Sequence, residues 1–353
     1  MKILLISPLP PPEGGIAIWT KKYKAYCEEH NQPLAIVNIA LIGSRSDHFN
    51  NKRNYIDEVK RTFHILGDLN RQLKIEEPDI VHLNSPCNGL GIFRDLLCAR
   101  MVKKAGLPLV LHCRSNIEDQ LAAGSAQSQK AFVKMAGLAD CVLTLNEPSH
   151  AYASLYARGK TRTVPNCIER EALNTEFTVG EQLRRLLFVG HVQKAKGAEE
   201  ILRAAAELPD IEFQMVGPVH EAIRHLPCPP NVHFLGNRHS KEVKEYLKTA
   251  DAFLFPSYTE GFSNALLEAM AAGLPCIATD VGANRDMIED QGGVIVPVGD
   301  SSAIVRAVNR LRDPDLRRRA SAWNLQKVEN AYLIEKVMET YFGIYREVIG
   351  EGR

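Results

Sequence analysis

The segment 251–282 constrains the fold of this chain more than any other part of the sequence. It contains two short apolar runs, 252–255 and 276–279, on either side of a longer apolar stretch over 261–272. Short continuous apolar runs are typical of buried parallel strands, and the longer stretch is followed by Gly273, a common helix end. The segment therefore predicts a strand, a helix and a second strand, which is the repeating unit of an α/β fold.

Two carboxylates of this segment lie beside or inside the predicted helix. Glu260 comes just before it, and Glu268 lies within it among alanine, leucine and methionine residues. A helix this apolar is usually buried, and a buried carboxylate is unfavourable unless it accepts a hydrogen bond. Backbone N–H groups at a helix start favour an anion, so the pattern indicates a phosphate over 261–264 with one carboxylate on each side. The alternative is that Glu260 is a solvated turn residue and Glu268 a capped polar group of the core.

The residues EGFSNALLE, which run from Glu260 to Glu268, resemble the E-x7-E motif of the family 4 glycosyltransferases. The surrounding PSYTEGFSNALLEAMAAGLPCIATDVG is similar to that family throughout. The resemblance implies the GT-B fold, which is α/β, with two Rossmann-like domains whose parallel sheets face each other across a cleft. It also implies that the C-terminal helix crosses back to the first domain, and that the donor is a nucleotide diphosphate sugar.

A strand, a glycine-containing loop and a helix are predicted at the head of both halves of the chain. The first set is the apolar run 2–6 followed by Gly14 and Gly15, and the second is the run 185–189 followed by Gly190. At 353 residues the chain is also longer than one ordinary core supports. We therefore predict an N-terminal Rossmann-like acceptor domain over 1–168, a linker over 169–183, a C-terminal Rossmann-like nucleotide-sugar domain over 184–330, and a C-terminal helix region over 331–353 that packs on the first domain.

Lys196 precedes a helix predicted to begin at Ala198, where a cation is disfavoured by roughly 0.3–1 kcal/mol. An anion between the lysine and the helix would reverse that sign, whereas a solvated loop lysine would have little effect. The resemblance of FVGHVQKAKG to the family implies that Lys196 binds the donor diphosphate. Where the family has an arginine after the first glycine, this chain has His191, and Lys194 is a candidate substitute.

The resemblance also implies roles for the other site residues. Glu260, Lys196 and His112 are the predicted catalytic residues, with Glu260 on the hydroxyls of the donor sugar. Glu268 is predicted to hold the ribose, and the loop of Asn237 to form the base pocket. The full set of predicted donor-binding residues is Gly14, Gly15, Gly190, His191, Asn237, Gly261, Phe262, Ser263, Asn264 and Glu268.

His112 and Arg114 follow an apolar run, 109–111, in the first half of the chain. Ligands of α/β domains gather at the carboxyl ends of strands, although a histidine at such a place is often structural. The resemblance implies that His112 faces the donor sugar, and Arg114 is a candidate for the acceptor side or a phosphate. The polar segment 31–54 is expected to include a loop near the acceptor. Residues 164–166 are similar to a segment that closes the first domain of the family, with Cys167 where the family has glycine.

Composition excludes several classes of protein. No apolar run approaches the ~18 residues that a membrane span needs. The eight cysteines show no C-x-x-C spacing, so we expect reduced core cysteines of a cytoplasmic protein and no disulfide or zinc framework. Asp313 and Asp315 have the D-x-D spacing of a metal motif but lie far from the E-x7-E motif in sequence. No metal or other cofactor is therefore expected.

The charge is distributed unevenly along the chain. Residues 1–168 hold 21 lysines and arginines against 15 acidic residues, a net charge of +6, whereas the remainder carries −5. A basic helix predicted over 93–105, with Arg94, Arg100, Lys103 and Lys104, suits either peripheral contact with the cytoplasmic membrane face or the ordinary outer layer of a Rossmann-type domain. No basic platform with interleaved aromatic residues indicates nucleic acid as a partner.

Together these features predict a retaining glycosyltransferase that moves a hexose or N-acetylhexosamine from a nucleotide diphosphate sugar to an acceptor hydroxyl. The acceptor is expected to be a glycan or lipid-linked glycan, in the synthesis of cell-surface polysaccharide, lipopolysaccharide or glycolipid. The residues 262–264, Phe-Ser-Asn, are similar to those of family members that use UDP-linked hexoses or N-acetylhexosamines, and this resemblance favours a UDP-sugar as the donor. The alternatives are a sugar-nucleotide epimerase or a phosphorylase of the same fold, and a non-catalytic subunit that binds nucleotide sugars.

Overall fold

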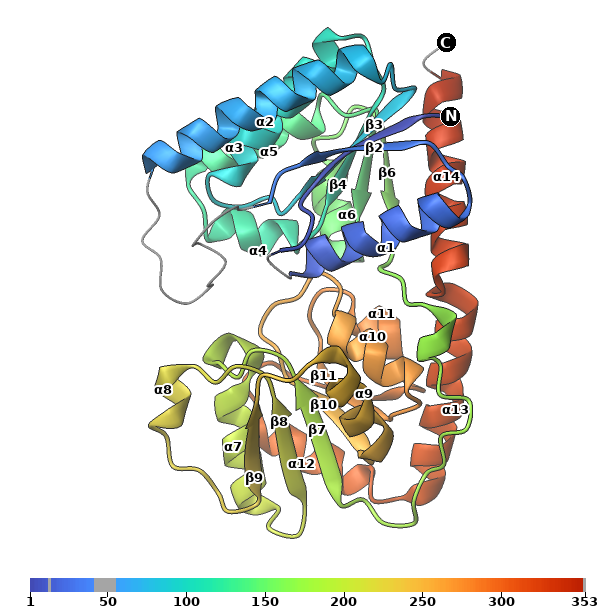
Figure 1. The fold of residues 1–353 in the computed structure, drawn as a ribbon. Helices are drawn as coiled ribbons and strands as arrows, with labels where there is room; N and C mark the ends of the chain where they lie inside the picture. The colour runs from blue at the N-terminus through green and yellow to red at the C-terminus, as the bar shows by residue number, and fades with distance from the viewer. Residues whose placement is uncertain (12–13, 41–54, 352–353) are drawn as a thin grey trace. The chain divides into compact units, whose positions relative to one another are not determined.

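The computed structural model describes residues 1–11, 14–40 and 55–351. The chain forms two compact units (Figure 1), the first consisting of 1–166 with 337–353 and the second of 167–336. Each unit is built on a six-stranded parallel sheet, which confirms the predicted α/β class with two Rossmann-like domains. The segment 169–183, expected to be a linker, lies in the second unit, and the last helix belongs to the first unit from Val337 onward.

The strands of the first sheet follow the order β2-β1-β3-β4-β5-β6. β1, β3, β4 and β5 are fully buried, as expected for parallel strands covered by helices on both faces. The chain leaves β1 toward one edge of the sheet and β3 toward the other, so ligands of this unit are expected near the ends of these two strands. The strands are β1 (Ile3–Ser7), β2 (Leu34–Asn38), β3 (Ile80–Ser85), β4 (Leu109–Cys113), β5 (Cys141–Thr144) and β6 (Lys160–Thr163).

The sequence analysis did not predict β6. Its residues, KTRT, include no apolar side chain, and most of them are exposed. β6 pairs only with β5 and forms the edge of the sheet, so its conformation depends on that pairing and not on an apolar pattern of its own.

Helices cover both faces of the first sheet (Figure 1). α2, α3 and α5 lie on one face, and α1 and the first-unit part of α14 lie on the other. The apolar core of the first unit lies under α2, α3 and α5, and includes Leu69, Val102 and Phe132. The helices are α1 (Gly15–Glu29), α2 (Tyr55–Ile75), α3 (Gly91–Lys104), α4 (Ile117–Ala122), α5 (Ala126–Ala136), α6 (Glu147–Ser154) and α14 (Ile334–Glu351).

The second sheet has the order β12-β11-β10-β7-β8-β9. The chain runs from β7 toward one edge and from β10 toward the other, so the two loops that follow these neighbouring strands diverge. Such a reversal point, at the carboxyl ends of parallel strands, is where α/β proteins bind ligands. The strands are β7 (Arg185–Val189), β8 (Glu212–Val216), β9 (Val232–Gly236), β10 (Ala252–Phe255), β11 (Cys276–Thr279) and β12 (Gly293–Val296).

Side-chain caps fix the starts of three helices of the second unit. Ser263, Asp300 and Asp313 each accept a hydrogen bond from a backbone N–H in the first turn of α10, α12 and α13. Arg317, which is fully buried, donates to the carbonyls of Leu311 (2.5 Å) and Gly180 (2.6 Å) and so fastens part of the segment 169–183 to this unit. The α-helices are α7 (Ala198–Glu207), α8 (Glu221–Arg224), α9 (Ser240–Thr249), α10 (Asn264–Ala271), α11 (Asn284–Ile288), α12 (Ser301–Arg310) and α13 (Pro314–Ala331), with 3-10 turns η2 (Arg170–Ala172) and η3 (Lys194–Lys196).

The cysteines are core residues, as predicted, with one exception. Seven of the eight are buried and all are free, whereas Cys228, in the loop before β9, is exposed. Within the described ranges, no helix is both long enough and apolar enough to cross a bilayer.

Candidate functional site

The loops that follow β7 and β10 lie against each other at the reversal point of the second sheet. The Tyr258 N–H donates to the Ala195 carbonyl (3.0 Å), which joins the two loops through their backbones. Gly197, which has a φ of 74°, lies so close to Pro256 that a Cβ would stand 2.2 Å from the Pro256 carbonyl oxygen. Only glycine fits this position, because it has no Cβ and tolerates a positive φ.

Lys196 and Glu260 form an ion pair between these loops. The Lys196 Nζ contacts Glu260 Oε1, and the Ser257 hydroxyl donates to the same oxygen at 2.7 Å. The exposed fraction of the side chain is 25% for Lys196 and 12% for Glu260, so the pair is largely but not wholly shielded from solvent. Ser257 is itself held, because its carbonyl accepts a hydrogen bond from the Thr279 hydroxyl (2.5 Å). The structure thus brings together two of the three predicted catalytic residues.

The start of α10 follows Glu260 directly. Ser263 caps the helix by accepting the Leu266 N–H at 3.2 Å, and Phe262 is buried against the edge of the Tyr332 ring. Gly282, with a φ of 55°, packs so closely on this turn that a Cβ would lie 2.2 Å from the Glu260 carbonyl oxygen. The turn 260–263 is therefore fixed, and the positive end of the α10 dipole begins three residues after the carboxylate that Lys196 contacts.

The inference that Glu268 is buried in the apolar core is wrong. The apolar residues of α10 are buried, but Glu268 is exposed. It lies four residues after Asn264, which is half-buried, so both belong to the one face of the helix that the core does not cover. An exposed carboxylate on this face has no burial cost that a partner must offset.

The other candidates of the second unit lie at the ends of strands of the same sheet. Gly190 and His191 follow β7, and His191 is exposed. Lys194, the candidate substitute for the missing arginine, is exposed and lies 3.8 Å from Glu199. Asn237 follows β9, two strands away from β7 in the sheet, and is also exposed. All four therefore lie at the carboxyl edge of the sheet that carries Lys196 and Glu260.

Gly14 and Gly15 occupy the predicted position in the first unit. Gly14 is extended and forms the N-cap of α1, and Gly15 is the first residue of that helix. Both are exposed. The expected acceptor loop is described only in part, because residues 41–54 lie outside the described ranges.

His112 is fully buried at the end of β4, where it joins a chain of hydrogen bonds. Arg114 Nη1 lies 3.1 Å from His112 Nε2, and His112 Nδ1 lies 3.2 Å from His82 Nε2. His82 Nδ1 in turn lies 2.5 Å from the Tyr345 hydroxyl of α14. Because a guanidinium only donates, each histidine accepts at Nε2 and carries its proton on Nδ1. Burial, and to a lesser extent the Arg114 charge, lowers the pKa of His82 to about 3 and that of His112 well below its usual range.

Arg114, the acceptor-side candidate, is buried as well. Its Nη2 donates to Asn166 Oδ1 at 2.7 Å, and its guanidinium lies 4.6 Å from the centre of the Trp19 ring. The sequence analysis did not identify Trp19, Asn166 or Tyr345 as partners of this group. The only available signal was that Asn166 belongs to the segment 164–166, which is similar to the family, since Trp19 and Tyr345 lie in ordinary amphipathic helices.

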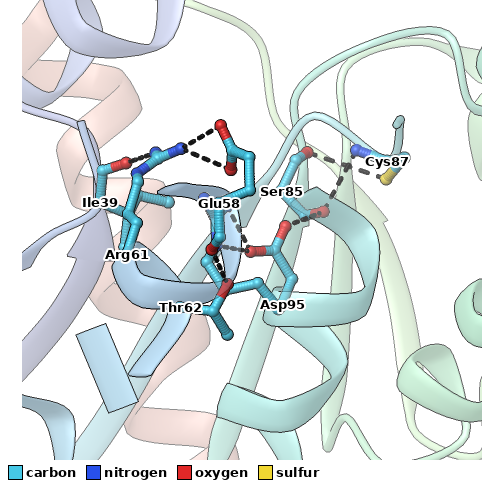
Figure 2. A network of polar contacts seen from close by, with 8 residues as sticks. Ile39, Glu58, Arg61, Thr62, Ser85, Cys87 and Asp95 are labelled. Carbon is cyan, nitrogen blue, oxygen red and sulfur yellow. Dashed lines mark hydrogen bonds and ion pairs between the residues drawn. The ribbon is translucent and has the colours of Figure 1, made fainter. Parts of the chain in front are cut away.

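A second polar network, buried at Ser85 and Asp95 and partly exposed at Glu58 and Arg61, lies at the ends of β2 and β3 (Figure 2). Asp95, which is fully buried, accepts from the Ser85 hydroxyl (2.7 Å) and pairs with Arg94 (2.6 Å). Arg61 pairs with Glu58 at 3.2 Å and donates to the Ile39 carbonyl. These charges neutralise one another, so we infer that the network stabilises the ends of β2 and β3. Among the described residues, no group of three or more histidine, cysteine or acidic side chains could hold a metal ion.

The second half of the chain is similar to known glycosyltransferases. Residues 169–324 match the family model described as Glycosyl transferases group 1. This match spans most of the second unit, and the family it describes is the one whose E-x7-E motif the residues from Glu260 to Glu268 resemble. N-acetyl-alpha-D-glucosaminyl L-malate synthase of Bacillus anthracis is 29% identical over 192 residues, covering 51% of this chain and 50% of that protein. Capsular polysaccharide biosynthesis glycosyltransferase CapM of Staphylococcus aureus is 25% identical over 190 residues, covering 51% of this chain and 48% of that protein. The chain thus spans about half the length of these two curated relatives.

Solved structures establish the fold of the whole chain. Sucrose-phosphate synthase from Thermosynechococcus elongatus has a TM-score of 0.80 at 17% identity, covering 99% of this chain and 100% of that chain. HepE from Anabaena, in complex with UDP and glucose, has a TM-score of 0.71 at 17% identity, covering 98% of this chain and 99% of that chain. At this identity the likeness shows the fold alone, and that fold is GT-B.

The first prediction concerns Gly197. Replacing Gly197 with alanine should separate the two loops and lower the free energy of unfolding by about 2–4 kcal/mol, because both the positive φ and the Pro256 carbonyl oppose a Cβ. Gly236→Ala is a matched control, since Gly236 has a φ of 71° and no atom within 4 Å of the Cβ position. Urea unfolding should show a clearly smaller loss for Gly236→Ala. Equal losses in the two variants would mean that the close approach to Pro256 is unimportant.

The second prediction concerns the neutral histidine pair. In the folded state both histidines stay neutral, whereas in the unfolded state they bind protons below a pH of about 6.5. Stability should therefore fall as the pH drops from 6.5 toward 3, by about 1.4 kcal/mol per pH unit for each histidine. Urea unfolding can follow Trp19 alone in a Trp323→Phe background, since the chain has two tryptophans. His82→Gln should remove about half of the pH dependence, and an unchanged slope would contradict the account.

Proposed function

We propose that the protein is a retaining glycosyltransferase that moves a sugar from a nucleotide diphosphate sugar to an acceptor hydroxyl. The observation that carries this proposal is the contact of Lys196 with Glu260 beside the start of α10. A cation, a helix N-terminus and a carboxylate adjoin there, at the place where parallel sheets bind ligands. This is the combination that a diphosphate joined to a sugar needs.

The chemistry follows from the charges that develop during transfer. As the bond between the sugar and the diphosphate breaks, negative charge grows on the leaving diphosphate and positive charge on the anomeric carbon. Lys196 and the start of α10 supply fixed positive charge for the diphosphate and so lower the barrier. Glu260 accepts hydrogen bonds from the sugar hydroxyls, and Glu268 from the ribose. The acceptor attacks from the face of the leaving group, which retains the anomeric configuration.

The donor we favour is a UDP-sugar that carries a hexose or an N-acetylhexosamine. The Phe262-Ser263-Asn264 sequence supports it, as does the complex of the structural neighbour HepE with UDP and glucose. The names of two relatives support an acceptor in cell-surface polysaccharide synthesis, since one is a capsular polysaccharide biosynthesis glycosyltransferase and the other a putative teichuronic acid biosynthesis glycosyltransferase of Bacillus subtilis. The enzyme would act in the cytoplasm. The roles of Gly14, Gly15, His112 and Arg114 toward donor and acceptor stay predictions.

The third prediction is a donor panel. UDP, GDP and ADP, each free and joined to glucose or N-acetylglucosamine, are tested for their effect on thermal unfolding. A true donor at 100 times its dissociation constant should stabilise the protein by about 2.7 kcal/mol. We expect the UDP compounds to act and Lys196→Gln to abolish their effect. Glu268→Gln should weaken the stabilisation by UDP compounds, because the carboxylate proposed to hold the ribose is lost. Lys241→Gln, which changes an exposed lysine of α9, should leave the stabilisation unchanged.

A flat response to the whole panel would count against any transferase. Incubation with the donor alone separates the epimerase alternative, because an epimerase turns over its substrate without an acceptor. A non-catalytic subunit would bind the donor but transfer nothing to any acceptor.

We further propose that the first unit contacts an anionic membrane surface through α2 and α3. Two of the basic residues expected on this face are engaged elsewhere, because Arg94 is buried against Asp95 and Lys103 pairs with Asp140 at 2.7 Å.

The exposed stripe of α3 consists instead of Phe93, Leu97, Arg100 and Lys104. The neighbouring α2 exposes Val59 and Phe63, with Phe63 71% exposed, beside Lys60 and Lys74. Apolar side chains flanked by cations suit the interface of a bilayer.

The fourth prediction tests this surface by sedimentation with vesicles. The protein should bind phosphatidylglycerol vesicles at low salt, and binding should weaken with added salt because of screening. Phe63→Ser with Leu97→Ser should lower binding at least about tenfold, because two large apolar side chains no longer enter the interface. Leu226→Ser is the control, since Leu226 is 37% exposed in the second unit and Leu97 is 40% exposed. Equal binding of both variants would rule this surface out.

A further inference from the structure

Tyr258 is held at both of its ends. It stands two residues before Glu260, and its backbone N–H donates to the Ala195 carbonyl (3.0 Å), one residue before Lys196. Its hydroxyl donates to Glu200 Oε1 at 3.0 Å, in the first turn of α7. One residue therefore joins the loop that carries Glu260 both to the loop that carries Lys196 and to the helix behind it.

Glu200 is an unusual partner because its carboxylate is buried. Only 2% of the residue is exposed. Oε1 accepts from Tyr258 and contacts Arg203, whereas Oε2 has no hydrogen-bond partner in the part of the chain that the structure describes. A buried carboxylate is unfavourable unless hydrogen bonds offset its lost hydration, although its place at a helix start helps. The Tyr258 hydroxyl is thus one of the few groups that make Glu200 acceptable there.

The proposed donor would separate the ion pair that joins the two loops. In the structure Lys196 and Glu260 contact each other. A bound donor would draw the lysine to its diphosphate and the carboxylate to its sugar, so their mutual contact would be lost. The contact of Gly197 with Pro256 and the two hydrogen bonds of Tyr258 use neither of these side chains. They are the links that survive when the donor enters.

We propose that Glu200 and Tyr258 are positioning residues for sugar transfer. They keep the backbone of Glu260 in place relative to Lys196 after the donor has separated the two side chains. This inference rests on the proposed function. It assigns neither residue a contact with the donor, and it predicts that their hydrogen bond matters more for turnover than for nucleotide binding.

The fifth prediction tests that hydrogen bond. With the UDP-sugar that the wild-type protein turns over, Tyr258→Phe should lower kcat by about tenfold. The affinity for UDP, measured by calorimetry, should change less than about threefold, because UDP lacks the transferred sugar that Glu260 would hold. Glu200→Leu should act like Tyr258→Phe, whereas Glu200→Gln keeps an acceptor for the hydroxyl and should retain kcat within about threefold. The double variant Tyr258→Phe with Glu200→Leu should be no slower than the slower single variant, since both remove one interaction.

Tyr246→Phe is the matched control. It removes a hydroxyl from a half-buried tyrosine of α9 in the same unit and should leave kcat unchanged. A wild-type kcat in folded Tyr258→Phe would overturn the inference. So would a parallel loss of kcat, UDP affinity and thermal stability, because that pattern marks a purely structural residue. A wild-type protein that transfers no sugar from any donor would instead contradict the proposed function.

Discussion

The parallel pairing of β10 with β7 is the constraint on which the site depends. Ala252 pairs with Leu186 and Phe253 with Leu187, so both strands end at the same edge of the sheet. Lys196 and Glu260 are 64 residues apart in sequence and meet only because each follows one of these strands. The order of strands reverses between β7 and β10, which leaves space above their ends for the two loops. The pairing of these two strands thus sets the positions of both loops and brings their two charged side chains together.

Much of this arrangement could be predicted from the sequence, because its signals are local. Proline and glycine bound the apolar runs of β10 and β11, so these strands lie where the pattern placed them. The start of α10 follows from Ser263, whose side chain serves as its cap. The exposure of Glu268 could not be predicted, because a mostly apolar helix of eight residues does not indicate which of its faces the core leaves uncovered. β6 has no apolar pattern, and its strand conformation depends on its pairing with β5.

The first unit shows the same limit in its polar core. The position of His112 at the end of β4 could be predicted, but its partners could not. One end of the hydrogen-bond chain is Tyr345, which lies 263 residues after His82, and nothing in an amphipathic helix indicates that one tyrosine will reach a buried histidine. The burial of Arg94 against Asp95 and of Arg317 against two carbonyls is equally invisible, because charged residues on a helix normally face solvent. Long-range polar partners are the part of the structure that sequence patterns do not contain.

The uneven exposure of the cysteines makes this protein easy to modify at one chosen point. Seven thiols are shielded, and Cys228 alone is accessible, in the stretch between α8 and β9. A maleimide dye or spin label added to the native protein would attach there without any engineered substitution. Burial raises the pKa of the Cys228 thiol, so the coupling should be more efficient in mildly alkaline buffer. The wild-type chain therefore already provides a single labelling site on its second unit.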